Sequence, residues 1–214
     1  MKTVAIITPI YATSENGRLD LFHHTCNSVA KQDLSIDSRL VYIVVDDGST
    51  VDVEEFLREE GFLRDCHNIM IRYIKRERLP SDLKTASNAL NMGIDLCIER
   101  SRDAFTESDA NNLYGVGFLH SDDLLTPDSV ETRLGYLDNG FVYGDMAFFN
   151  NKGRVIDIRK GDAKLNKEDI PVIKNYSRFN HHTIMWQVEF LRYLKDFAAR
   201  KYEQSGVFDP LLSH

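Results

Sequence analysis

Two adjacent aspartates, Asp122 and Asp123, follow an apolar run in the segment GVGFLHSDDLLTP, with His120 and Ser121 directly before them. The apolar run has the composition of a buried strand, so the acids are expected where that strand ends. Two adjacent negative charges destabilise the fold at such a place unless a cation binds to them and links them to another anion. Mg²⁺ or Mn²⁺ would suit, because such ions are held by one or two carboxylates together with substrate phosphates. The alternative is that both acids only favour the start of the next helix, and the residues alone leave both interpretations open.

A second acidic pair, Asp46 and Asp47, ends the β-branched run in RLVYIVVDDGST. By themselves these residues favour a turn at Gly48, with Ser49 or Thr50 capping the following helix. The segment differs from the D-x-D-G-T motif of phosphatases that form an aspartyl-phosphate, because no acid stands two residues before Asp47.

Other chemistries have little support in the sequence. The chain contains no P-loop, dinucleotide-binding or nucleophile-elbow motif,. A zinc site led by His120 is disfavoured because no other histidine or cysteine has matching ligand spacing. The pair His181 and His182 is interpreted first as structural polar groups.

The elements that must position the acids alternate along the first two-thirds of the chain. Short β-rich runs predict strands at 3–11, 39–46, 68–74 and 113–120,. Helical spacing predicts helices at 17–32, 51–61, 81–100 and 126–137, the third of them with an apolar face of Leu83, Ala86, Leu90 and Ile94. This order predicts an α/β fold with a mainly parallel sheet and helices on both faces. Because ligands bind beyond the carboxyl ends of parallel strands, residues 9–11, 46–49 and 120–123 are expected to converge on one crevice.

The remaining third has a different pattern. A hairpin around NNKG, a short strand in NHHTIMW and a helix over QVEFLRYLKDFAARKY are predicted,. We expect one domain over 1–214, with a ligand-binding half at 1–139 and a smaller half at 140–214. The polar segment Arg100–Asn112 lacks periodicity and predicts an inserted, mobile surface loop.

Composition narrows the class of protein. The chain has 214 residues, 43% hydrophobic and 28% charged, with a formal net charge of −7. This charge disfavours nucleic acid as a partner, and the most basic run, RYIKRERL, is interpreted as a solvated strand edge. Three cysteines without C-x-x-C spacing favour a reducing compartment, so a cytoplasmic protein is expected,. No apolar stretch reaches membrane-spanning length.

The order of the polar segments carries more information than any one of them. ITPIY, VVDDGST, ASNALNMGI and FLHSDDLLTP follow the predicted elements in turn, and FVYGDMAFFNNKGRV and GVFDPLL come later. Together they resemble glycosyltransferase family 2, whose members have the GT-A fold and use nucleotide-diphospho-sugars. The resemblance covers the whole chain. It implies sugar transfer to a saccharide or lipid-linked acceptor, as in polysaccharide biosynthesis, with a lipid-linked acceptor placing the protein at the inner membrane face.

The resemblance also implies roles for single residues. Thr8, Pro9 and Tyr11 would form the wall around the base, and Asp47, or less favourably Asp46, would accept a hydrogen bond from a base N–H such as that of uracil. Asn91 would shape the floor under the sugar-diphosphate, with Lys84 a weaker phosphate contact. The metal motif falls on Asp122 and Asp123, which would hold Mn²⁺ or Mg²⁺, and Ser121 lies beside the nucleotide. The family's leading aspartate is His120 here, which removes one negative charge and leaves a group that can bind a ribose hydroxyl.

The family's mechanism is an inverting single displacement in which a base removes the acceptor's proton. In family members an acidic motif with that base follows a segment like GVFDPLL. The chain ends at His214 just before that point, so we expect the base beyond it, with His182 and Asp209 as weaker candidates. Two other functions stay open: a glycosyltransferase-like nucleotide-binding module, and a sugar-1-phosphate nucleotidyltransferase, although the latter should have a glycine-rich basic loop after the first strand.

Overall fold

The computed structural model describes residues 1–64, 68–78, 86–150, 154–160 and 184–205. Its strands are β1 Lys2–Ile10, β2 Ser38–Asp46, β3 Ile69–Lys75, β4 Leu113–Phe118, β5 Phe141–Val142, β6 Met146–Phe149, β7 Val155–Arg159 and β8 Met185–Gln187. Its helices are α1 Arg18–Ala30, α2 Val53–Glu59, α3 Ser87–Ile98, α4 Glu107–Asn111, α5 Ser129–Tyr136 and α6 Val188–Ser205, with a 3₁₀ turn at Leu137–Asn139.

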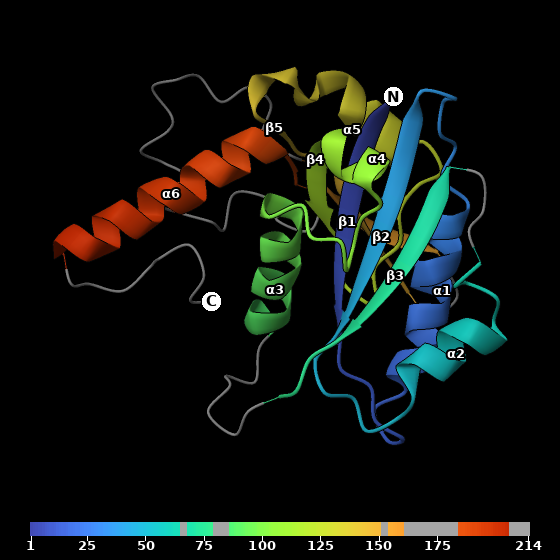
Figure 1. The fold of residues 1–214 in the computed structure, drawn as a ribbon. Coiled ribbons are helices and arrows are strands. Elements are labelled where there is room, and N and C mark those ends of the chain that lie inside the picture. The colour runs from blue at the N-terminus through green and yellow to red at the C-terminus, as the bar shows by residue number, and fades with distance from the viewer. Residues whose placement is uncertain (65–67, 79–85, 151–153, 161–183, 206–214) are drawn as a thin grey trace.

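A six-stranded sheet of order β3-β2-β1-β4-β8-β5 forms the centre of the molecule. The first four of these strands are parallel, and β8 pairs antiparallel with both β4 and β5. Helices α1 and α2 lie on one side of the sheet and α3 on the other (Figure 1). The predicted α/β fold with a mainly parallel sheet is therefore confirmed.

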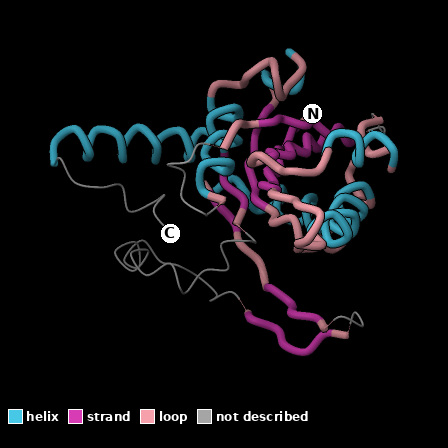
Figure 2. Tube along the Cα trace, turned by 90° about the horizontal axis from the view of Figure 1, so that it is seen from below, coloured by secondary structure: helices cyan, strands magenta, loops and turns pink. Residues whose placement is uncertain are grey.

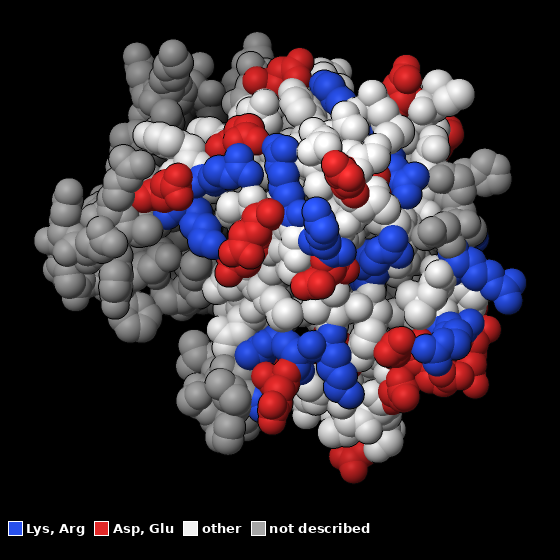
Figure 3. Space-filling model, in the orientation of Figure 1, with Lys and Arg blue, Asp and Glu red and all other residues white. Residues whose placement is uncertain are grey.

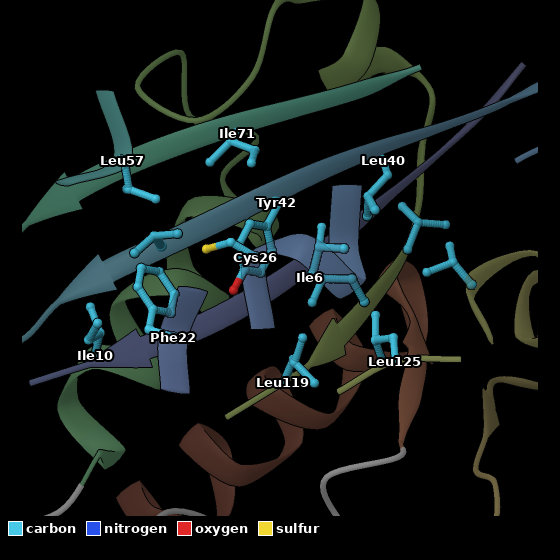
Figure 4. Close-up of a cluster of buried hydrophobic side chains, with 14 of the residues drawn as sticks. Ile6, Ile10, Phe22, Cys26, Leu40, Tyr42, Leu57, Ile71, Leu119 and Leu125 are labelled. Atoms are coloured by element: carbon cyan, nitrogen blue, oxygen red, sulfur yellow. The ribbon is translucent and has the colours of Figure 1, made fainter. Parts of the chain in front are cut away.

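Alternate residues of the central strands supply two separate cores, as the period of a strand requires. One face contributes Ile6 and Tyr42 to a cluster with Phe22 and Cys26 of α1, which Figure 4 shows in close-up. Burial raises the pKa of the Cys26 thiol and of the Tyr42 hydroxyl. The opposite face buries the neighbouring residues of β1 and β2 against α3, α6 and the segment before α4; its members include Ala5, Ile7, Val41, Ile43, Ala89, Cys97, Phe105 and Val188. Both faces are covered, so the near-continuous apolar strands are explained.

The start of α2 differs from the prediction. Asp52 caps this helix by accepting a hydrogen bond from the backbone N–H of Glu55 at 2.9 Å. Ser49, one of the two expected caps, accepts instead from the backbone N–H of Ala12 at 2.9 Å. The serine hydroxyl thus joins the segments after β1 and β2, a partnership between distant residues that local propensity does not reveal.

The apolar face of α3 was predicted only in part, since Leu90 and Ile94 do pack against the core. Leu90 and Ile94 are half-buried and Ala86 is the N-cap, whereas the buried positions are Ala89, Gly93, Leu96 and Cys97. Leu83 lies outside the described residues. A Cβ on Gly93 would stand 2.5 Å from Cγ2 of Ile7, so the helix approaches β1 closely where the glycine has no side chain.

The segment Arg100–Asn112 is not the surface loop that its polarity predicted. It contains α4, which begins after the N-cap Thr106, and it buries Ala104 and Phe105 in the core. Asp109 is buried and pairs with Arg39 of β2 at 2.6 Å. Because two apolar residues and one charged partner hold the segment, a composition rich in polar residues misrepresents it.

The predicted hairpin and last helix are both present. Strands β6 and β7 form a separate two-stranded antiparallel sheet that stands away from the main body (Figure 2). Helix α6 extends outward from the main body in another direction (Figure 2). The hairpin exposes Phe149, Val155, Ile156 and Ile158. In the part of the chain that the structure describes, no helix is both long and apolar enough to cross a membrane.

Candidate functional site

The polar segments that follow β1, β2 and β4 meet at one edge of the sheet. These strands are neighbours, with Ile10 opposite Asp46 and Ile7 opposite Phe118. The backbone N–H of Asp47 donates to the carbonyl of Ile10 at 2.8 Å, and the Thr8 hydroxyl donates to the carbonyl of Leu119 at 2.7 Å. The convergence expected for parallel strands is thus observed in the backbone itself.

Asp46 has two structural partners and is fully buried. Its carboxylate accepts from the backbone N–H of Ser49 at 2.8 Å and from the hydroxyl of Tyr73 at 2.7 Å. Partial burial and the hydrogen bond to Asp46 raise the pKa of Tyr73. Both carboxylate oxygens are therefore engaged in holding the turn after β2 against β3, which makes Asp46 the less suitable of the two acids for a ligand.

Asp47 is the acid that faces a cation. Its carboxylate forms an ion pair with the Arg76 guanidinium, and the two side chains are 6% and 14% exposed. Arg76 directly follows β3, and its backbone N–H donates to the carbonyl of Asp46 at 2.9 Å. Backbone and side chain thus fix the arginine beside the aspartate, and the carboxylate lies against a full positive charge.

Tyr11 stands at the rim of the same edge, 41% exposed. The Arg78 guanidinium lies 4.7 Å from the centroid of the tyrosine ring. Gly48, with φ of +77°, makes room for this arginine, since a Cβ there would stand 2.9 Å from Cβ of Arg78. An aromatic ring and a planar cation at a rim can hold a flat, electron-rich ring such as a nucleotide base.

Asp122 and Asp123 lie in the turn after β4, next to α1. A carboxylate oxygen of Asp122 is 2.6 Å from Nη1 of Arg18, the first residue of that helix. The described residues contain no group of three His, Cys, Asp or Glu side chains that could hold a metal ion. A hard cation that obtains its other ligands from phosphate and water needs only one or two carboxylates. The pair therefore fits a divalent ion that arrives with a phosphate ligand, and does not fit a complete protein-only cage.

The remaining predicted residues have different positions. Thr8 and Pro9 are buried near the carboxyl end of β1. In the turn after β4, Ser121 is buried and His120 is half-buried beside the two acids. Asn91 is half-buried in the second turn of α3, and its side chain makes none of the hydrogen bonds found among the described residues. Lys84, His182 and Asp209 lie outside the described residues.

Sequence reasoning missed the cations of the site. Arg76 and Arg78 belong to the run RYIKRERL, which was interpreted as a solvated strand edge, and β3 is indeed the edge strand. Their position directly after a strand, like that of the acids, is the signal that could have identified them. Arg18 carries no such signal, because only the fold shows that α1 begins beside the turn after β4. On the face in Figure 3, acidic and basic side chains are interspersed, with no continuous basic band.

Sequence comparisons do not place the chain in a family. No protein-family model matches it, and no curated protein matches it either. The order of segments that resembles glycosyltransferase family 2 therefore remains a sequence-based prediction.

Comparison with solved structures identifies the fold. TarS of S. aureus, residues 1–349, is 16% identical with a TM-score of 0.58, covering 91% of this chain and 49% of that one. The same protein in complex with UDP is 18% identical, with a TM-score of 0.53 and coverages of 91% and 49%. The mannosyltransferase PcManGT from Pyrobaculum calidifontis, in complex with GDP-Man and Mn²⁺, is 17% identical, with a TM-score of 0.53 and coverages of 89% and 46%. This chain thus has a glycosyltransferase fold of the GT-A type and spans about half the length of these structures.

Proposed function

We propose that this chain is the donor-binding part of an inverting, metal-dependent glycosyltransferase. It would transfer a sugar from a UDP-sugar to a saccharide or lipid-linked acceptor, on the cytoplasmic side of a membrane. One observation carries the proposal: in a glycosyltransferase fold, Tyr11, the Asp47–Arg76 pair and Asp122 meet at the carboxyl ends of adjacent parallel strands. In such folds this edge is where ligands bind.

The base is recognised by the first part of this edge. Asp47 can accept from the N–H of a uracil imide, and a charged acceptor makes that hydrogen bond strong. Arg76 occupies part of the same carboxylate and fixes its direction. The exposed ring of Tyr11, with Arg78 over it, provides a surface on which the base can lie. Recognition of uracil over a base without an imide N–H then depends on the hydrogen bond to Asp47 that the wrong base cannot donate.

The diphosphate is placed by the turn after β4. Asp122 and Asp123 would hold Mn²⁺ or Mg²⁺, and the ion, when bound, neutralises charge that develops on the departing nucleotide diphosphate. His120 in the same turn offers a hydrogen-bonding group to a ribose hydroxyl. Asn91, in the second turn of α3, would shape the floor below the sugar. The general base is proposed to come from the acceptor side, for which His182 and Asp209 are the candidates of this chain.

A thermal-shift panel tests the proposal directly. UDP, GDP, dTDP and UTP, each with and without Mn²⁺, are added to the purified chain, and a ligand that binds the folded state raises its unfolding midpoint by mass action. We expect UDP with Mn²⁺ to give the largest shift and UDP alone a smaller one. A shift confined to nucleoside triphosphates would favour a nucleotidyltransferase, and no shift with any nucleotide would contradict the proposed site. Release of UDP from UDP-sugars then separates an enzyme from a binding module.

A further inference from the structure

Arg18 is paired with the carboxylate that the proposed function assigns to the metal. Nη1 of Arg18 lies 2.6 Å from Oδ2 of Asp122, with the two side chains 32% and 44% exposed. A guanidinium at this distance occupies one face of the carboxylate with a full positive charge. A divalent cation cannot approach that oxygen while the arginine is there, since both would need the same lone pairs and they repel each other.

The arginine is also connected to the proposed base-binding rim. The amide of Asn16 donates to the carbonyl of Tyr11 at 3.0 Å, and its side-chain oxygen accepts from the backbone N–H groups of Thr13 and Arg18, both at 3.1 Å. Gly17, with φ of +59°, turns the chain into α1 directly before Arg18. The loop from Tyr11 to Arg18 is thus a single hydrogen-bonded unit, with an aromatic ring at one end and the guanidinium at the other.

We propose that Arg18 competes with the divalent cation for Asp122 and moves to the donor's diphosphate when the nucleotide binds. The inference rests on the proposed function, because it concerns the same carboxylate. Without nucleotide, Arg18 neutralises Asp122 and the protein binds the metal weakly. The diphosphate offers the guanidinium a second anionic partner of suitable fork geometry, which frees Asp122 for the metal.

Arg18 thereby couples the two ligands. Metal affinity rises when nucleotide is bound, and by linkage nucleotide affinity rises by the same factor when metal is bound. The arginine is a positioning residue in this scheme, because it acts on the metal through Asp122. In the metal-free protein, Arg18 also reduces the repulsion between Asp122 and Asp123, because Asp122 is already paired with its guanidinium.

Titration of Mn²⁺ followed by electron paramagnetic resonance tests the proposal without any activity assay, because the signal of the free hydrated ion falls as it binds. Wild type, Arg18→Gln and Arg18→Lys are titrated with and without UDP. For Arg18→Gln we expect Mn²⁺ affinity without UDP to rise roughly three- to tenfold. A change of this size corresponds to the energy of an exposed ion pair and to a modest coupling between two ligands. UDP should then strengthen Mn²⁺ binding less in this variant than in wild type, while Arg18→Lys, which keeps the charge, should stay closer to wild type.

Two controls separate the specific effect from a general change in charge. Arg58→Gln removes the same charge from a more exposed arginine, which pairs with Glu54 and Glu55 on α2, and it should leave Mn²⁺ affinity unchanged. In an Asp122→Asn background, Arg18→Gln should have no effect on Mn²⁺ affinity, since the shared carboxylate is gone. Circular dichroism confirms that each variant is folded before it is titrated.

The outcomes distinguish this inference from the proposed function. Equal Mn²⁺ affinity in wild type and Arg18→Gln, with UDP and Mn²⁺ still binding, would overturn the competition and leave the proposed site intact. An equal rise in Arg58→Gln would also overturn it, because the effect would then be one of net charge. No Mn²⁺ binding by folded wild type, even with saturating UDP, would overturn both.

Discussion

Arg76 and Asp47 form a nearly buried ion pair at the carboxyl ends of β3 and β2, with side-chain exposures of 14% and 6%. Breaking a pair of this kind is costly because it leaves one charge buried and uncompensated. The ion pair therefore holds the carboxylate in a fixed place, as its proposed role of accepting a hydrogen bond from a base requires. Asp46, one residue earlier, is engaged instead with Tyr73 and the turn.

Replacing Asp47 tests its role in base recognition. Asp47→Asn keeps the shape of the side chain but removes a charged acceptor, so we expect UDP binding to weaken by roughly 1–3 kcal/mol. Isothermal titration calorimetry, well below the unfolding midpoint, measures the loss. The matched control is Asp37→Asn, which makes the same change at an exposed position just before β2 and should bind UDP like wild type. Unchanged UDP affinity in Asp47→Asn would show that this aspartate does not contact the base.

Asp46 is expected to affect stability. Asp46→Ala removes an acceptor for the Ser49 N–H in the turn and for the Tyr73 hydroxyl on β3, and both hydrogen bonds are part-buried. We expect the free energy of unfolding to fall by about 3–6 kcal/mol, the sum expected for two hydrogen bonds to a charged group. Urea unfolding followed by circular dichroism measures it. Tyr73→Phe removes one of the two bonds and should cost less than half as much; a near-neutral Asp46→Ala would refute the structural role.

The parallel half of the fold could be predicted because its strands are buried on both faces. Runs such as RLVYIVVDD have no other stable location than the inside of such a sheet, and the repeated strand–helix order then sets the class,. The segment 100–112 could not be predicted in this way. Its position depends on the pairing of Asp109 with Arg39 and on two apolar residues, Ala104 and Phe105, and these long-range contacts leave no periodic trace.

The site, too, could be predicted only in part. The convergence of the polar groups that directly follow the strands was predicted correctly, since topology alone brings the ends of neighbouring parallel strands together. The partners of those groups were not, because an arginine has the same sequence signal whether it is solvated or paired. Arg76, Arg78 and Arg18 each acquire their place from a neighbouring element. Which of the two adjacent acids is engaged in holding the turn likewise depends on Tyr73, which lies on another strand.

The acids after β4 are tested by removing both. In Asp122→Ala/Asp123→Ala we expect UDP to bind without any gain from Mn²⁺, because the proposed metal ligands are gone. Calorimetric titration of UDP with and without Mn²⁺ measures the gain in wild type and variant. Glu59→Ala/Glu107→Ala removes the same charge from two exposed helical positions and should preserve the gain. A full Mn²⁺ effect in the first variant would move the metal site elsewhere.

Buried thiols should make the fold sensitive to alkaline pH. Burial in the core raises the pKa of Cys97 above its ordinary value, so the folded state keeps the proton after the unfolded thiol, with a pKa of about 8.5, has lost it,. The stability that this group contributes is therefore complete below about pH 8.5 and decreases as the pH rises above it. At pH 9.5 the loss is about 1.4 kcal/mol for this thiol.

Cys97→Ala isolates that contribution. Urea unfolding at pH 7.5 and pH 9.5 gives the difference in stability between wild type and variant, and this difference should shrink by about 1.4 kcal/mol at the higher pH. The comparison cancels the titration of every other group in the chain. A difference that is equal at the two pH values would show that the thiol reaches solvent in the folded state.

Gly93 is expected to fix the position of α3, the helix that carries Asn91. A Cβ at this position would stand 2.5 Å from Cγ2 of Ile7, in the middle of β1, which is held by strands on both sides. Neither the strand nor the helix can retreat without opening the core, so Gly93→Ala should lower the free energy of unfolding by about 1–3 kcal/mol. Gly135→Ala in α5 meets no atom within 4 Å and should raise it by about 0.5–1 kcal/mol, as alanine does in a helix,.

Urea unfolding of the two variants gives opposite signs if close approach is the cause, since both substitutions are otherwise the same change within a helix. Ile7→Ala removes the methyl group that the new Cβ would meet. The double variant Gly93→Ala/Ile7→Ala should therefore lose less stability than the sum of the two single losses, by at least about 0.5 kcal/mol. Strict additivity, or a gain in stability in Gly93→Ala, would mean that α3 does not approach β1 as closely as the structure shows.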